Sequence, residues 1–452
     1  MFRVRFRCGA LALGMIALFA PSSSYALPTE LVPRWSAFYG YSPTLRTPPS
    51  VGVGSDSLAR ALAIAVSPDG TRTYVTGLAH SANASIAYDT ANGAELWTAS
   101  FPGSGGWPAA DIAVNPDGTR VYVTARAIAA TTTVAYDATE GTQLWTARYD
   151  DALGYGSEWG PAPQRLAVSP DGTRAYIAAG SGTVAYDATD GSQLWVAPEG
   201  SGSDLAVSPD SSRVYVSGES STVALDAGDG SQIWVAPGTG SGGDFAMSID
   251  GASLYVVGWK TRLTTSSYDA VDGSLRWSFA AYDHSYSGYY FQDAELAVGP
   301  DRRVFVTATL PGVTLAFDDR GLLQWIAQNS LPGFSRTLSV SPDGLVYVSA
   351  SGSSEIGLFY PLPYYHHSRS ALVVYDYLGN EVSTTSFEAE WSDVAVSSDG
   401  SRLFATGSIA QWAPGIQAHS WATVAFCKDV RRALYELSDA DIPSRPACLT
   451  GL

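Results

Sequence analysis

Lysine, cysteine and histidine are the scarcest functional residues in this sequence. Its 452 residues include two lysines, Lys260 and Lys428, three cysteines and five histidines, and only 15% of the residues are charged. Acidic residues outnumber basic ones by 43 to 26, which gives a formal net charge of −17. An acidic protein repels a phosphate backbone, so nucleic acid is excluded as the expected partner.

Long apolar runs are missing beyond the first 26 residues. No later stretch reaches the roughly 20 apolar residues that a membrane helix needs, so we expect no transmembrane segment in the mature chain. The N-terminal stretch carries three arginines before the apolar core Leu11 to Ala20, which is too short to span a bilayer. Small residues follow at Ser24 and Ala26, the two positions that a signal peptidase recognises before its cleavage site. The sequence therefore predicts a signal peptide over residues 1–26 and an exported protein, periplasmic or extracellular.

The known catalytic motifs are absent as well. The sequence has no Gly-x-Ser-x-Gly, no His-Glu-x-x-His and no P-loop. Its five histidines are His80, His284, His366, His367 and His419. Only His366 and His367 are neighbours, and a solvated pair in a loop is favoured over a pair of metal ligands. The sequence thus favours a protein that is not an enzyme, without deciding the point.

The cysteines indicate one disulfide. Cys8 lies in the predicted signal peptide, which leaves Cys427 and Cys448 in the mature chain. In an exported protein we expect these two to pair, with a contribution of about 3 kcal/mol to stability in the chain-entropy model. Two free redox-active thiols are the alternative, which the absence of a Cys-x-x-Cys spacing disfavours.

A repeated unit fills most of the chain, and residues 111–145 show it in full. A short apolar run leads to the turn Asn115-Pro116-Asp117-Gly118, two further runs follow, and an acidic turn at Asp137 to Gly141 precedes Trp145. Pro at the second position and Gly at the fourth suit a tight turn, so each pair of runs is predicted to form a hairpin. Eight such turns recur, at residues 67–70, 115–118, 169–172, 208–211, 248–251, 299–302, 341–344 and 398–400. Six units end in a tryptophan: Trp97, Trp145, Trp195, Trp234, Trp277 and Trp325.

Four short strands in units of this length are typical of propeller blades. We predict an all-β, eight-bladed β-propeller of four-stranded antiparallel blades, with seven blades as an alternative because the last two units lack the tryptophan. The eighth unit lacks a good fourth strand, and the stretch around Trp35 resembles the end of a repeat. Residues 31–40 are therefore expected to close the ring and remove an exposed sheet edge. The predicted organisation is one propeller domain over residues 27–452, with repeats over 61–427 and a tail over 428–452.

The repeat also resembles known families. Its Ala-Tyr-Asp-x-x-x-Gly-x-x-x-Trp ending is similar to the tryptophan-docking repeat of quinoprotein-like (PQQ-binding-like) β-propellers, and Ser67 to Gly77 resembles YVTN-type propeller repeats. The resemblance implies the fold, and implies that the tryptophans dock one blade on the next. Quinoprotein dehydrogenases of this fold hold PQQ and Ca²⁺ in the central channel beside a disulfide between adjacent cysteines. This chain has no Cys-Cys pair and no Cys-x-x-Cys-His, which disfavours that chemistry.

The two hairpin turns of each unit are short and uniform, so the variable connections must lie on the opposite face. We name this the long-loop face; its expected loops include residues 149–164, 281–293, 351–369 and 408–420. Loop variation on a rigid scaffold is typical of binding sites, and these loops are rich in aromatic residues. The candidate ligand-binding residues are Trp159, Tyr286, Tyr289, Tyr290, Tyr364, Tyr365, His366, His367 and Trp412. The alternative is that these side chains pack the loops against one another.

A second candidate site is the mouth of the central channel. The residues just before the innermost strands are Ala63, Asp111, Arg165, Asp204, Asp244, Glu295, Thr337 and Asp393. Carboxylates that converge there would bind a cation or have raised pKa values, so Asp111, Asp204, Asp244, Glu295 and Asp393 are the candidate metal ligands. The alternative is that each carboxylate caps its own strand through backbone N–H groups.

The sequence as a whole favours an exported, non-enzymatic binding or scaffold protein that takes a protein, peptide or glycan ligand on the long-loop face. Two enzyme classes stay open: a PQQ/Ca-dependent quinoprotein-like oxidoreductase, and a propeller hydrolase or lyase acting on a polysaccharide or lactone. The leading hypothesis requires no cofactor, while Ca²⁺ stays open and PQQ is disfavoured.

Overall fold

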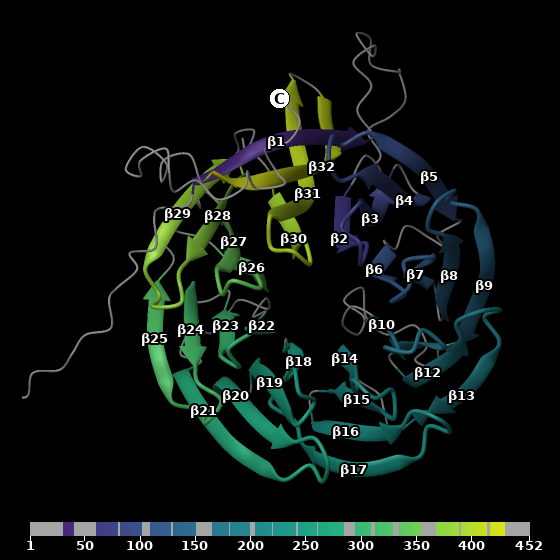
Figure 1. The fold of residues 1–452 in the computed structure, drawn as a ribbon, viewed down its shortest axis with the longest axis vertical. Helices are drawn as coiled ribbons and strands as arrows, with labels where there is room; N and C mark the ends of the chain where they lie inside the picture. Colours follow the sequence, from purple (N-terminus) through teal and green to yellow (C-terminus); the bar gives the residue numbers. More distant parts are fainter. Residues whose placement is uncertain are drawn as a thin grey trace, which may run out of the picture.

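The computed structural model shows a ring of β-sheets around a central axis (Figure 1). It describes residues 30–39, 60–79, 82–101, 109–127, 130–150, 165–179, 181–198, 204–218, 220–240, 243–259, 261–283, 294–308, 312–328, 334–353, 368–387, 390–413 and 416–429. The predicted signal peptide, the tail beyond Asp429 and Cys448 lie outside these residues, so the proposed cleavage and disulfide stay predictions. The described residues contain no helix that is long and apolar enough to cross a membrane.

Eight four-stranded sheets make up the ring, and each is a blade whose neighbouring strands pair antiparallel. Blade 1 contains β2 (Arg60–Val66), β3 (Arg72–Ala79), β4 (Ala82–Asp89) and β5 (Glu95–Phe101). Blade 2 contains β6 (Ala109–Val114), β7 (Arg120–Ala127), β8 (Ala130–Asp137) and β9 (Gln143–Asp150). Blade 3 contains β10 (Leu166–Val168), β11 (Arg174–Ala179), β12 (Gly182–Asp187) and β13 (Gln193–Ala197). Blade 4 contains β14 (Asp204–Val207), β15 (Arg213–Ser217), β16 (Ser221–Asp226) and β17 (Gln232–Pro237).

The second half of the ring repeats this order. Blade 5 contains β18 (Phe245–Met247), β19 (Ser253–Trp259), β20 (Arg262–Asp269) and β21 (Leu275–Asp283). Blade 6 contains β22 (Ala294–Val298), β23 (Val304–Ala308), β24 (Val313–Phe317) and β25 (Leu323–Gln328). Blade 7 contains β26 (Phe334–Val340), β27 (Val346–Ser353), β28 (Ser368–Tyr375) and β29 (Glu381–Phe387). Blade 8 contains β30 (Glu390–Val396), β31 (Arg402–Ala413), β32 (Ile416–Asp429) and, from the other end of the chain, β1 (Glu30–Tyr39).

The predicted ring closure is confirmed. β1 pairs antiparallel with β32, from Glu30 opposite Asp429 to Tyr39 opposite Trp421, with a bulge between Pro33 and Trp35. Figure 1 shows β1 lying across the outside of blade 8. The prediction of eight blades is therefore correct, and the seven-bladed alternative is wrong.

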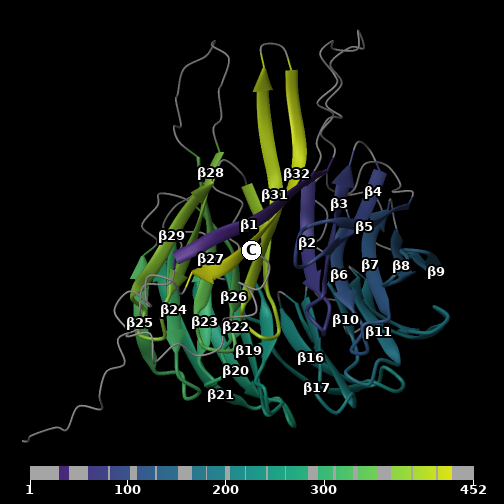
Figure 2. The same cartoon turned by 45° about the horizontal axis from the view of Figure 1, so that its top comes forward.

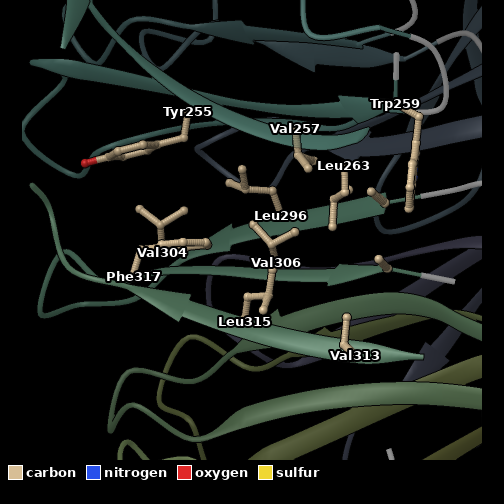
Figure 3. Close-up of a cluster of buried hydrophobic side chains, with 12 residues drawn as sticks. Tyr255, Val257, Trp259, Leu263, Leu296, Val304, Val306, Val313, Leu315 and Phe317 are labelled. Carbon is tan, nitrogen blue, oxygen red and sulfur yellow. The ribbon is translucent and has the colours of Figure 1, made fainter. Parts of the chain in front are cut away.

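Apolar side chains fill the junctions between blades. The described residues form eight buried clusters, and each one combines residues of two neighbouring blades. At the junction of blades 5 and 6, Val257 of β19 packs with Leu296 of β22 and Val306 of β23 (Figure 3). A four-stranded sheet cannot bury both of its faces alone, so the alternating pattern of each strand is satisfied only when the ring is complete.

Seven tryptophans dock one blade on the next, as the repeat predicted. Each indole Nε1 donates a hydrogen bond of 3.0–3.3 Å to a turn carbonyl of the following blade: Trp35 to Thr90, Trp97 to Ala138, Trp145 to Ala188, Trp195 to Ala227, Trp234 to Ala270, Trp277 to Asp319 and Trp325 to Tyr377. The same ring lies against the glycine of that turn, where an added Cβ would meet it at 2.5–2.7 Å. Glycine is required at these positions for two reasons: a side chain would clash with the indole ring, and φ lies between +70° and +85°.

The missing eighth tryptophan has a topological cause. Blade 7 carries Ser383 where the other outer strands carry tryptophan, opposite Val374 of β28. The tryptophan that belongs to blade 8 is Trp35, because β1 is that blade's outer strand. Blade 8 has no turn between its third and fourth strands, since these come from opposite ends of the chain. A tryptophan at Ser383 would find no turn to dock on, and Phe387 packs against Trp391 and Phe426 of blade 8 instead.

One predicted loop is corrected by the structure. Residues 408–420 were expected to form a loop, but β31 and β32 stay paired through this stretch, up to Ala413 opposite Ile416. The stretch contains one Pro-Gly turn signal, at residues 414–415 between the two strands, and no other break in the pairing. Figure 2 shows the resulting two-stranded hairpin projecting beyond the ring.

Candidate functional site

The eight predicted mouth residues lie at the ends of the innermost strands that face the long loops. The prediction that each precedes its strand is correct for Arg165 and Asp244 and wrong for the other six, which lie within the strands because pairing begins earlier. Each innermost strand runs from the channel mouth towards the first short turn of its blade, so the mouth and the short turns are at opposite ends. Arg165 contacts Asp204 of blade 4 and Glu295 of blade 6, and the charges of Arg165 and Asp111 act on the pKa of Asp393.

Three aspartates bridge neighbouring blades through backbone N–H groups. Asp111 accepts hydrogen bonds from the N–H of Ile112, in its own strand, and of Leu166, in the next blade, both at 2.8 Å. Asp393 likewise accepts from its own Val394 at 2.8 Å and from Ile64 of blade 1 at 3.0 Å. These contacts agree with the alternative prediction, in which each carboxylate caps its own strand. Each carboxylate also caps the innermost strand of the neighbouring blade.

Asp244 and Asp204 each show one of these two kinds of contact, Asp244 with the next blade and Asp204 with its own strand. Asp244 accepts from Leu296 N of blade 6 at 2.7 Å, and Asp204 accepts from Leu205 N at 2.8 Å. Thr337 donates to Asp393 at the junction of blades 7 and 8, over 3.4 Å. These hydrogen bonds link blade 2 to 3, blade 5 to 6, blade 7 to 8 and blade 8 to 1, so the carboxylates that make them stabilise the ring itself.

Arg165 replaces aspartate in blade 3 and lies among the carboxylates. Its Nε is 3.9 Å from Asp204 Oδ1 of blade 4, and one guanidinium nitrogen is 3.8 Å from Glu295 Oε1 of blade 6. The side chain therefore reaches across the mouth rather than only along its own rim. Burial lowers the pKa of Arg165, but the charges of Asp204, Asp111 and Glu295 outweigh burial and raise the pKa above its usual value.

The buried carboxylates hold protons more tightly than free ones. Burial, followed by the charge of Asp244 and a hydrogen bond with its carboxyl, raises the pKa of Asp204 well above its ordinary range. Burial also raises the pKa of Asp111, and that of Asp393 to about 6, although the backbone hydrogen bonds and Arg165 act in the opposite direction. The mouth thus combines buried carboxyl groups of raised pKa with the positive charge of Arg165.

A Ca²⁺ ion with PQQ does not suit this donor set. The carboxylates accept backbone N–H groups of one or two blades, and Arg165 brings a positive charge to the place where a cation would bind. Among the described residues, no group of three or more His, Cys, Asp or Glu could hold a metal ion. We therefore derive no chemistry through a quinone, and Ca²⁺ binding by Asp111, Asp204, Asp244, Glu295 and Asp393 stays a prediction for titration to test.

The aromatic candidates fall almost entirely outside the described residues. Eight of them do so: Trp159, Tyr286, Tyr289, Tyr290, Tyr364, Tyr365, His366 and His367. Trp412 lies in β31, paired with Gln417 of β32, near the end of the projecting hairpin. Sequence reasoning placed this residue in a loop and so missed the hairpin, for which the Pro-Gly pair at residues 414–415 was the available signal.

Comparison with known proteins places the chain among propellers. A family model described as outer membrane protein assembly factor BamB matches residues 82–223 and 218–358. The crystal structure of BamB from Moraxella catarrhalis is similar, with a TM-score of 0.52 and 15% identity over 88% of this chain and 99% of that one. The Dos1 propeller gives a TM-score of 0.61 at 12% identity, over 88% and 95% of the two chains. No curated protein sequence matches this chain. At these identities the structural similarities establish the fold alone.

Proposed function

Because the chain belongs to the propeller family described as outer membrane protein assembly factor BamB, we propose that it is an exported, non-enzymatic scaffold whose long-loop face binds a protein partner. The family supports a scaffold or binding role in general. Export is supported by the signal-peptide pattern of residues 1–26, and the choice of face by the arrangement of loops on a rigid ring.

The observation that carries the proposal is the contrast between the two faces. On the opposite face the turns are nearly identical from blade to blade, and tryptophan docking uses their glycines and carbonyls. On the long-loop face the connections differ in length, and one hairpin projects beyond the ring. The residues of the short turns are needed to hold the blades together, so they cannot vary to suit a partner. The residues of the long-loop face are not needed in this way and can form a binding surface.

Site-specific cross-linking in the exporting cell tests the choice of face. A photoreactive phenylalanine analogue would replace Tyr289 or Tyr364 in the long loops and, as matched controls, the exposed turn residues Thr139 or Thr189. We expect a discrete protein adduct from the long-loop positions and none from the turns. Adducts from the turn positions alone would place the partner on the other face and overturn the proposal.

Thermal unfolding tests whether the protein is instead an enzyme that uses the channel. The mature protein, stripped of metal, would be melted alone, with Ca²⁺, and with Ca²⁺ and PQQ. A ligand of the native state raises the midpoint by mass action, and we expect neither addition to shift it. A Ca²⁺ shift that grows with PQQ would reinstate the oxidoreductase, and a shift with Ca²⁺ alone would favour the hydrolase or lyase.

A further inference from the structure

The hairpin of β31 and β32 extends past the strands that flank it. Pairing of β30 with β31 ends at Glu390 opposite Ser408, and pairing of β1 with β32 ends at Tyr39 opposite Trp421. Pairing between β31 and β32 continues for five more residue pairs, from Ile409 opposite Ser420 to Ala413 opposite Ile416. We name residues 409–413 and 416–420 the ribbon; it projects beyond the ring in Figure 2.

The equivalent hairpins of blades 1 and 2 build no such ribbon. In blades 1 and 2 the equivalent hairpins close at Ala79 opposite Ala82 and at Ala127 opposite Ala130. Their flanking strand ends within two residues of that point, at Leu78 in blade 1 and at Ala125 in blade 2. The repeat therefore needs no ribbon to complete a blade, and the ribbon of blade 8 is an addition to the fold.

Both edges of the ribbon present backbone groups for pairing. Within the described ranges, no strand pairs with residues 409–413 on the side of β30, and none pairs with residues 416–420 on the side of β1. A strand edge offers a row of N–H and C=O groups that a further strand can satisfy. A two-stranded hairpin by itself is marginally stable in water, so an added strand would also stabilise the ribbon.

The ribbon lacks the residues that usually prevent strand addition. Proteins protect exposed edges with charged side chains, above all lysine, or with proline within the strand. Residues 409–420 contain no Asp, Glu, Lys or Arg, and neither ribbon strand contains proline, in a chain of which 15% is charged. The ribbon sequence instead includes Ile409, Trp412 and Ile416. An uncharged, unprotected edge favours an uncharged, extended polypeptide and disfavours a glycan, which cannot continue a backbone ladder.

We propose that the ribbon is a strand-addition site, which binds an extended, uncharged β-strand segment of the partner protein along one of its edges. Five residues at about 3.3 Å each give an edge of roughly 16 Å, enough for a segment of about five or six residues. Backbone hydrogen bonds supply most of the recognition, so the site accepts many sequences that alternate apolar and small polar residues. This inference rests on the proposed function and specifies how the long-loop face holds its partner.

A ribbon-deleted variant provides the test. Residues 409–420 are replaced by Asn-Gly, which joins Ser408 to Trp421 in a two-residue hairpin turn and keeps every pair from Arg402 opposite Cys427 to Ser408 opposite Trp421. A second variant keeps the ribbon but protects it with charge, Gln411→Lys with Gln417→Lys. The thermal midpoints of both variants are expected to match that of the wild type, since the blade itself is unchanged.

The probe is a fluorescein-labelled peptide of about ten residues that alternates Val and Thr, titrated with the mature protein and followed by anisotropy. We expect saturable binding with a Kd of about 10–100 μM, weakened at least about tenfold in both variants. A copy of the peptide methylated on alternate backbone nitrogens should bind equally weakly, because it cannot continue the ladder. Equal binding by wild type and the deletion variant, or no effect of methylation, would refute strand addition.

Two further outcomes separate the possible occupants. Sedimentation velocity that shows a wild-type dimer and a monomeric deletion variant would assign the ribbon to a second copy of this chain, against the proposal. Cross-linking from Tyr289 or Tyr364 is then repeated in the deletion variant. Adducts that persist at full yield would leave the proposed function intact and reject the ribbon as its means of binding, whereas failure of the same adducts in the wild type would reject the proposed function itself.

Discussion

Trp35 and Gly93, which are 58 positions apart in the sequence, hold the two ends of the ring together. The indole donates to Thr90 O at 3.0 Å, and its carbons lie where a Cβ on Gly93 would sit, at 2.5 Å. Six more tryptophan–glycine contacts repeat this arrangement, but this one joins blade 8 to blade 1 and depends on a strand from the other end of the chain. It is therefore the contact on which ring closure can be tested most directly.

Alanine at Gly93 should destabilise the protein more than alanine at Gly70. Both glycines have φ near +70°, where alanine costs about 1–2 kcal/mol, but nothing lies within 4 Å of a Cβ at Gly70. At Gly93 the clash with Trp35 adds about 1–3 kcal/mol of overpacking. Urea unfolding of Gly93→Ala and Gly70→Ala measures the difference, and equal losses would show that the indole moves aside without cost.

A tryptophan in an outer strand is expected to stabilise the ring only where the following blade has a turn on which the indole can dock. Trp145→Ala removes an indole that is 7% exposed, and should lower the free energy of unfolding by about 3–5 kcal/mol. Ser383→Trp should bring no gain, because the third and fourth strands of blade 8 come from opposite ends of the chain and no hairpin turn joins them. Chemical unfolding of the two variants checks both statements; a stabilised Ser383→Trp would mean that another surface takes the indole.

The pKa of Asp393 predicts a pH dependence of stability. Its pKa is raised from 3.8 to about 6 in the folded state, so the fold binds this proton more tightly than the unfolded chain does. Below pH 3.8 the carboxyl is protonated in both states, and its burial does not lower the free energy of unfolding. As pH rises from 3.8 through 6, the unfolded state loses its proton first, so the free energy of unfolding falls. We expect the free energy of unfolding to fall less steeply between pH 4 and pH 6 in Asp393→Asn than in the wild type. Parallel curves for the two proteins would argue against the raised pKa.

Removal of Arg165 should matter far more than removal of a surface arginine. Arg165→Met leaves Asp204 and Glu295 without their shared cation; because the Arg165 side chain is 35% exposed, the expected cost is about 1–3 kcal/mol, below that of breaking a fully buried ion pair. Arg148→Met is the matched control, since its pair with Asp150 is largely exposed and worth at most about 1 kcal/mol. Thermal unfolding at pH 8 compares them, and at pH 5 the Arg165 variant should recover part of its loss as the carboxyls take up protons.

The fold could be predicted well from the sequence because the same turn and strand signals recur in every repeat. Turn residues such as Pro116 and Gly118 act locally, and eight copies of the unit support one another, so strand order and ring closure could be derived without a structure. The absent tryptophan at Ser383 looked like degeneracy because its explanation is topological: no local pattern shows that the neighbouring blade lacks a turn.

The candidate site was harder to predict. The position of the acidic residues near the start of the innermost strands could be read from the repeat, but their hydrogen bonds to Leu166, Leu296 and Ile64 are contacts between blades. No spacing along the chain reveals such contacts. The reach of Arg165 across the mouth to Glu295 is likewise a property of the closed ring. The Pro-Gly pair at residues 414–415 could have indicated the hairpin, but the length of the ribbon depends on where the flanking strands stop.

The pairing of Glu30 with Asp429 also fixes where anything attached to the propeller must leave it. A lipid anchor, a fluorescent protein or a second domain fused before Glu30 would depart from the same short stretch of the rim as one fused after Asp429. Two such attachments would be neighbours, which suits energy-transfer measurements of whether blade 8 opens. Circular permutation would join Glu30 to Asp429 by a linker and open the chain at one of the short turns. Blade 8 would then come from one continuous segment, and the opened blade would be the one built from both ends of the chain.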